Sequence, residues 1–251
     1  MNPQLLLDNI RTVLMRLEET IIFDLIERAQ FRRNACIYDP AAFGETIGGG
    51  SLLAYLLRET ETVHARMRRY TSPDEKPFSD NLPDPILPAM NFSESPIDPN
   101  TVNLNERILA VYIQQIVPLI CDPGDDGQYG SSAVADVNCL QNLSHRIHYG
   151  MFVAESKFRA DPERYATAID EADTESLRKL ITNQEVEEKL LRRVEIKTRH
   201  YGQDVNEIGA ERSGPCKIPP DTVRDIYRDW IIPLTKDAEV EYLLQCKGTP
   251  E

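Results

Sequence analysis

Apolar residues recur along this chain at the spacing of helix faces, not at the alternation that marks strands. One such series, at steps of four, three, four and four, consists of Ile10, Leu14, Leu17, Ile21 and Leu25. This spacing places them on one face of a helix of about 5–31. Similar patterns predict helices over about 52–70, 106–120, 132–159, 162–168, 174–181, 185–201 and 221–246, the last bent near Pro233. The chain is therefore predicted to be all-α.

The connections between these helices favour one helical domain over 1–251. The stretch 71–103 contains seven prolines and no glycine, which is typical of a stiff, ordered loop. A polar loop is predicted at 202–220. Ser51 is a candidate cap after the turn formed by Gly48, Gly49 and Gly50. No strand precedes this turn and no GK[ST] follows it, so we do not expect it to bind phosphate.

Composition excludes several classes of protein. The 251 residues carry a formal charge of −13, which argues against broad nucleic-acid binding and against anionic membrane surfaces. No apolar run approaches a membrane span, and the first residues resemble neither a signal peptide nor a transit peptide. The five cysteines are scattered and odd in number, which favours reduced thiols and a cytoplasmic protein. His145 and His148 lack a clear third ligand, so no metal site is expected.

Several charged and polar pairs lie at helical spacing and could hold a small anion. Arg146 and Lys157 are eleven residues apart, which is three turns plus 20°, so they share a face about 16.5 Å apart along the axis. Three pairs lie at i,i+4, and one arginine lies among apolar positions of the first helix; these residues are Asn183 with Glu187, Arg193 with Lys197, Thr235 with Glu239, and Arg11. Each of these charges taken alone is more simply read as a solvated side chain or a weak surface ion pair.

Five blocks of sequence then point to a family. The chain resembles the eukaryotic-type chorismate mutases, the all-helical enzymes of fungi and plants, in the same order from Asp8 to Leu244. The blocks are DNIRTVLMRLEETIIFDLIERAQF, HARMRRYTSPDEKPF, CLQNLSHRIHYGMFVAESKF, ITNQEVEEKLLRR and IPLTKDAEVEYLL. The resemblance is weak in 34–50, 79–104 and 203–220.

The resemblance implies a [3,3] rearrangement of chorismate to prephenate in phenylalanine and tyrosine biosynthesis, with no cofactor and no covalent intermediate. Such an enzyme works by holding a flexible dianion and stabilising charge on its ether oxygen. By resemblance, Arg11 and Arg146 bind carboxylates and Lys157 donates to the ether oxygen. Glu187 holds the ring hydroxyl, with Asn183 one turn before it, while Thr235 and Glu239 line the other wall. Arg193 and Lys197 are expected to orient Glu187.

The resemblance also implies a homodimer that tryptophan activates and tyrosine inhibits. The effector site would combine Arg68 and Arg69 with Gly130 and Ser131 of the other subunit. Two positions depart from the family pattern, because Pro219 and Val134 stand where threonines are expected. A proline fixes φ and removes a donor, so Pro219 is predicted to lock one allosteric state.

Two other hypotheses stay open from the sequence. One is a catalytically silent helical dimer that senses aromatic amino acids, against which the intact set of candidate catalytic residues argues. The other is a secreted effector that consumes host chorismate, against which the expected lack of a signal peptide argues.

Overall fold

The structure, a computed structural model, describes residues 5–89, 95–203 and 216–246. Within these ranges the chain is helical, and the β-type pairing consists of one isolated bridge between Gln203 and Cys216. The α-helices are α1 (Leu7–Arg28), α2 (Pro40–Ile47), α3 (Leu52–Arg66), α4 (Asn105–Val111), α5 (Val117–Ile120), α6 (Tyr129–His148), α7 (Gly150–Ala160), α8 (Pro162–Asp170), α9 (Thr174–Ile181), α10 (Gln184–Tyr201), α11 (Pro220–Ile226) and α12 (Ile232–Gln245). The all-α prediction is confirmed, and the single domain over 1–251 stays a prediction.

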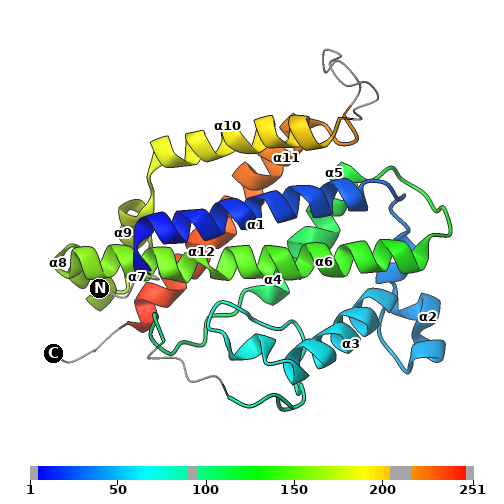
Figure 1. Ribbon diagram of the computed structural model, residues 1–251, viewed down its shortest axis with the longest axis horizontal. Coiled ribbons are helices and arrows are strands. Elements are labelled where there is room, and N and C mark those ends of the chain that lie inside the picture. Colours follow the sequence, from blue (N-terminus) through cyan, green and yellow to red (C-terminus); the bar gives the residue numbers. More distant parts are fainter. Residues whose placement is uncertain (1–4, 90–94, 204–215, 247–251) are drawn as a thin grey trace.

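The long helices lie side by side around one core. α1 packs along α6, α10 lies on the far side of α1, and α12 crosses beneath α6 and α7 (Figure 1). The apolar stripe predicted for the first helix faces this core, with Ile10, Leu17, Ile21 and Leu25 all buried. Burying each such side chain contributes roughly 1.5–3 kcal/mol, so this packing fixes the position of α1 against α6.

Two predicted helices contain a wider turn ahead of a proline. A π-helical turn, Tyr112–Ile116, joins α4 to α5 two residues before Pro118, and a second, Tyr227–Ile231, joins α11 to α12 two residues before Pro233. A proline ring clashes with the carbonyl four residues earlier and offers no N–H, so the helix widens there without breaking. The bend predicted near Pro233 therefore takes the form of a π turn.

The other boundaries differ from the predicted ones in small ways. The helix predicted at 132–159 begins at Tyr129 and divides into α6 and α7 at Tyr149, and α3 ends at Arg66. α2 was not predicted. Ser51 caps α3 as expected, since its hydroxyl accepts from the amide of Ala54, and the three preceding glycines all have positive φ.

The proline-rich loop is anchored to the helices where it is described. The buried carboxylate of Glu61 accepts from the amides of Phe78 and Ser79 at 2.7 and 2.8 Å. Further along, Leu104 donates to Nε2 of the buried His148. These contacts support a stiff loop, although residues 90–94 of it, like 204–215 of the second predicted loop, lie outside the described residues. Among the described helices, none is long and apolar enough to cross a membrane.

Candidate active site

The candidate site lies where α6 and α7 meet α12. Arg146, near the end of α6, approaches Thr235 at 3.5 Å between its Nη1 and the hydroxyl. Lys157 of α7 approaches Glu239 at 3.6 Å between Nζ and Oε2, and donates to the carbonyl of Ile181 at 2.6 Å. Because Thr235 and Glu239 lie one turn apart on α12, the two cations that share a face reach adjacent positions on a single helix.

Two polar atoms of this site are buried without a hydrogen-bond partner, Nε of Arg146 and Oε2 of Glu239. Both residues are nearly inaccessible, at 4% and 6% exposed. A buried polar atom normally has a hydrogen-bond partner, so each of these two unpaired atoms requires an explanation. A polar ligand between α6 and α12 would satisfy both atoms.

The electrostatics of the site follow from this burial. Desolvation raises the pKa of Glu239 above its ordinary value, while the nearby charges of Lys157 and Arg146 oppose the shift. Desolvation likewise lowers the pKa of Arg146, against the carboxylates of Glu18 and Glu239. Burial therefore makes the Glu239 carboxyl easier to protonate than an exposed one, and a protonated carboxyl beside cations can donate a hydrogen bond to a developing negative charge.

Arg193 and Lys197 have a different partner from the one expected. Arg193 forms two hydrogen bonds, at 2.9 and 2.7 Å, with the buried carboxylate of Glu18, and Lys197 lies 3.2 Å from the same group. Lys197 also donates to Glu19. These contacts arise because this face of α10 packs against α1. No described contact therefore links these two cations with Glu187, and their orienting role stays a prediction.

Glu187 instead pairs with Lys236 of α12 at 2.8 Å. It lies in the first turn of α10, before that helix reaches α1, so α12 provides the nearest cation. Glu18 and Lys236 were missed from the sequence. The sequence does contain a sign that Glu18 is buried, because this charged residue lies between Leu14 and Ile21 on the apolar face of the first helix.

Asn183 and Lys157 line a cavity of about 520 Å³ beside this site. Asn183 also caps α10, since its side chain accepts from the amide of Val186 at 3.2 Å. Leu5, whose carbonyl accepts from Ser156 at 2.8 Å, closes one side of the cavity. Arg11 is exposed and donates to Asp8 at 3.1 Å, so no described contact brings it to Arg146 or Lys157.

Comparison with known proteins places the chain in a family. The family model for chorismate mutase type II matches residues 128–240. A chloroplastic chorismate mutase 1 of Petunia hybrida is 49% identical over 95% of this chain and 75% of its own length. The chorismate mutase of Schizosaccharomyces pombe is 48% identical over 97% of both chains. This chain belongs to the type II chorismate mutase family.

Solved structures of the family have the same fold. AtCM1 with tyrosine bound in an allosteric site matches with a TM-score of 0.87 and 46% identity, covering 97% of each chain. The chorismate mutase of Candida albicans in complex with L-Trp matches with a TM-score of 0.88 and 39% identity, over 96% of this chain and 91% of that one. Effector binding is therefore a property of relatives with the same architecture.

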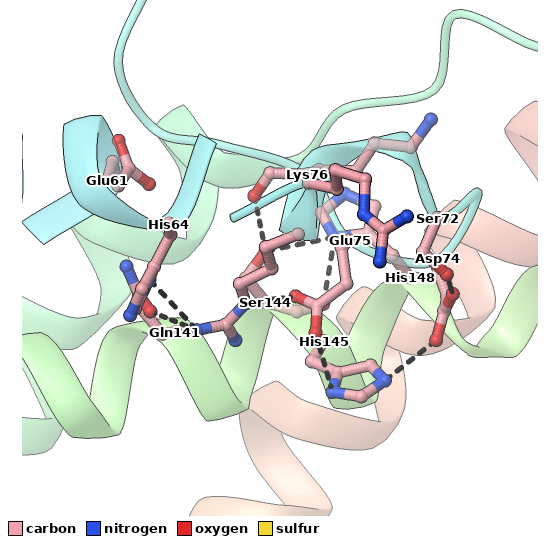
Figure 2. Close-up of polar contacts among 12 residues, drawn as sticks. Glu61, His64, Ser72, Asp74, Glu75, Lys76, Gln141, Ser144, His145 and His148 are labelled. Carbon is pink, nitrogen blue, oxygen red and sulfur yellow. Dashed lines mark hydrogen bonds and ion pairs between the residues drawn. The ribbon is translucent and has the colours of Figure 1, made fainter. Parts of the chain in front are cut away.

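The predicted effector residues lie in two separate places within one chain: Arg68 and Arg69 in one, Gly130 and Ser131 in the other. Arg69 donates to Glu75 at 2.9 Å and to Gln141 of α6 at 2.5 Å. Close to these partners, Asp74 pairs with His145, which also lies on α6 (Figure 2). Arg68 has a positive φ and donates to the carbonyl of Pro88.

Gly130 and Ser131, in contrast, line a hollow of about 550 Å³ at the start of α6 together with the exposed Val134. Gly130 precedes Gln141 by eleven residues, or about 16.5 Å of helix, so a single chain does not bring the two groups together. Pro219, the other departure, immediately precedes α11 as its N-cap residue with φ −60°, and its carbonyl accepts from the amide of Thr222.

Proposed function

We propose that this chain carries out the reaction of its family, the rearrangement of chorismate to prephenate, in the site between α6, α7 and α12. The observation that carries the proposal is the pair of buried atoms without partners, Nε of Arg146 and Oε2 of Glu239. In a protein of charge −13, a site that combines the buried Arg146 with the partly buried Lys157 is suited to a small dianion.

The proposed roles follow from the charges of the substrate. Chorismate carries two carboxylates and a breaking ether bond, and the rearrangement needs no covalent intermediate. Arg146 binds one carboxylate through its planar guanidinium, and Arg11 is proposed to turn from Asp8 toward the other. Lys157 and protonated Glu239 donate to the ether oxygen, whose negative charge grows as the C–O bond breaks.

The remaining residues hold the substrate or support those that do. Thr235 contributes its hydroxyl beside Arg146, and Asn183 contributes an amide at the entrance to the cavity. Glu187 is proposed to hold the ring hydroxyl, which requires sharing it with Lys236. Arg193 and Lys197 neutralise Glu18 close to Arg146, so the site keeps a net positive potential.

The direct test is a continuous assay of chorismate absorbance with purified chain. We expect saturable turnover without any added metal or cofactor, and prephenate as the product by chromatography. Turnover no faster than the uncatalysed reaction would contradict the proposal and would favour the alternative of a silent amino-acid sensor. The names of the relatives lend that alternative no support.

We also propose that the active form is a homodimer regulated by tryptophan and tyrosine, with Arg68 and Arg69 of one subunit facing Gly130 and Ser131 of the other. The separation of these groups within one chain and the effector complexes of relatives support this assignment. We propose a cytoplasmic location because all five cysteines are free thiols. Sedimentation analysis with and without each amino acid tests the assembly.

A further inference from the structure

Gly150 lies at a close approach of α7 to α12. It is the first residue of α7, one turn after Arg146, and its own backbone conformation does not require glycine because its φ is not positive. A Cβ atom at this position would lie 2.7 Å from Cγ2 of Thr235, 3.2 Å from the carbonyl oxygen of Thr235 and 3.3 Å from Cγ of Glu239. The reason for glycine here is therefore space, and the atoms that take up the space belong to two candidate site residues.

The space beside the backbone of Gly150 forms a notch in the surface of α7. The methyl group of Thr235 occupies this notch, and this packing fixes the direction of the Thr235 hydroxyl. The hydroxyl donates to the carbonyl of Ile231 at 2.7 Å and faces Nη1 of Arg146 at 3.5 Å. A β-branched side chain has stiff rotamer preferences, so moving the methyl group out of the notch would rotate the hydroxyl away from both partners. The carbonyl contact at 3.2 Å also prevents α7 from accepting a side chain without moving apart from α12.

Other helical glycines do not share this environment. Gly44, in the interior of α2, would place a Cβ 3.7 Å from its nearest neighbour, the carbonyl oxygen of Gly50, which is an ordinary contact. Gly130 of α6 has nothing within 4 Å. Gly44 therefore supplies a matched control for replacing a helical glycine by alanine.

We propose that Gly150 is a positioning residue for the rearrangement, acting through Thr235 and Glu239. By allowing close approach of α7 to α12, it sets the Thr235 rotamer and the separation between the Arg146–Lys157 face and the Thr235–Glu239 face. This inference rests on the proposed function. It adds a residue that neither lines the cavity nor contacts the substrate in the proposed roles.

A merely structural role predicts a different result from a positioning role. If Gly150 served only packing, Gly150→Ala would lower the thermal midpoint but leave kcat per folded molecule unchanged. If it positions the site, kcat falls in molecules that are fully folded, and removing the obstructing methyl group restores it. Thr235→Ser deletes Cγ2 and keeps the hydroxyl, so the double variant separates the two roles.

The experiment measures kcat, KM and thermal unfolding for wild type, Gly150→Ala, Thr235→Ser, Gly150→Ala/Thr235→Ser and Gly44→Ala. We expect Gly150→Ala to lower kcat by about tenfold to 10²-fold, since a displacement of about 1 Å can cost 10²-fold. KM should change less than kcat. The double variant should exceed Gly150→Ala in kcat at least threefold, and Gly44→Ala should match wild type.

Three outcomes overturn the inference. Wild-type kcat in folded Gly150→Ala removes any positioning role, and a double variant no faster than Gly150→Ala removes Thr235 as the route. If Gly150→Ala does not fold, the double variant is compared with Thr235→Ser, because the added Cβ atom still meets the Thr235 carbonyl oxygen and Cγ of Glu239. A folded double variant with the kcat of Thr235→Ser overturns the inference, while a lower kcat supports it. An inactive wild type is a failure of the proposed function itself and is distinguished from these results by the wild-type assay.

Discussion

Two buried arginine–carboxylate clusters include α6, and they differ in how completely their hydrogen bonds are satisfied. In the first, Arg28 donates through Nε to Asp136 at 2.6 Å, and its other nitrogens reach three backbone carbonyls, Cys121 and Tyr38. Asp136 accepts in addition from Tyr38 and Tyr112. Neither Arg28 nor Asp136 is exposed to any extent.

The second cluster consists of Arg146, Lys157 and Glu239. Arg146 and Glu239 are nearly as buried, but Nε of Arg146 and Oε2 of Glu239 have no hydrogen-bond partner. The first cluster therefore resembles a fixed part of the fold, whose charges are paired and fully bonded. The second contains donors and acceptors that a ligand can use. The comparison teaches that satisfaction of hydrogen bonds, more than burial or charge, separates a structural cluster from a candidate site.

Breaking the first cluster should have the largest effect on stability. Arg28→Met leaves Asp136 buried without its cation, and removing one partner of a buried pair costs about 3–5 kcal/mol. We expect the free energy of unfolding in urea to fall by this amount, while kcat per folded molecule stays unchanged. A loss below about 1 kcal/mol would contradict the structural role of the cluster.

Breaking the second cluster should affect the rate instead. Lys157→Ala removes a donor to the ether oxygen, and the loss of one such donor costs about 10²–10³ in kcat. Stability should change little because the Lys157 side chain is partly exposed. Lys189→Ala, which removes an exposed lysine paired with Glu185 on α10, is the control and should retain wild-type kcat. A near wild-type kcat for Lys157→Ala would exclude Lys157 from the mechanism.

The pH dependence of kcat sharpens the role of Glu239. Burial raises its pKa, so the protonated, hydrogen-bond-donating form is fully present at low pH and is lost as pH rises through that pKa. We therefore expect an acidic optimum for wild type. Glu239→Gln keeps a donor at every pH and should extend activity to neutral and mildly alkaline pH. A wild-type profile that is flat from about pH 5 to 8 would argue against this account.

The smallest expected effect concerns tryptophan. Pro219 immediately precedes α11, at the position where the family pattern places a threonine, and its fixed φ restricts that connection. An effector changes activity only through different affinities for two states, so a locked state binds tryptophan without responding. We expect less than about a twofold change in kcat/KM on adding tryptophan at saturating concentration. Pro219→Thr should increase the response, and a several-fold response in wild type would show that Pro219 does not lock the switch.

Much of the fold could be predicted from sequence because helical periodicity is a local property. The spacing of Ile10, Leu17 and Leu25 predicted both α1 and its buried face. Arg146 and Lys157 could be placed on one face from their separation alone, and α12 receives both of them. Where helices contain prolines, the π turns were not predicted, since the pattern of apolar residues is the same for a bend and for a widened turn.

The sequence by itself determined the helices, the shared face of Arg146 and Lys157, and the residue types that mark the family. Only the tertiary structure decided which charges meet. Arg193 binds Glu18 because α10 packs against α1, and Glu187 binds Lys236 because the first turn of α10 comes within reach of that α12 side chain. The raised pKa of Glu239 and the notch at Gly150 have the same origin. Desolvation and close approach depend on atoms from distant segments, and no local pattern specifies where those atoms lie.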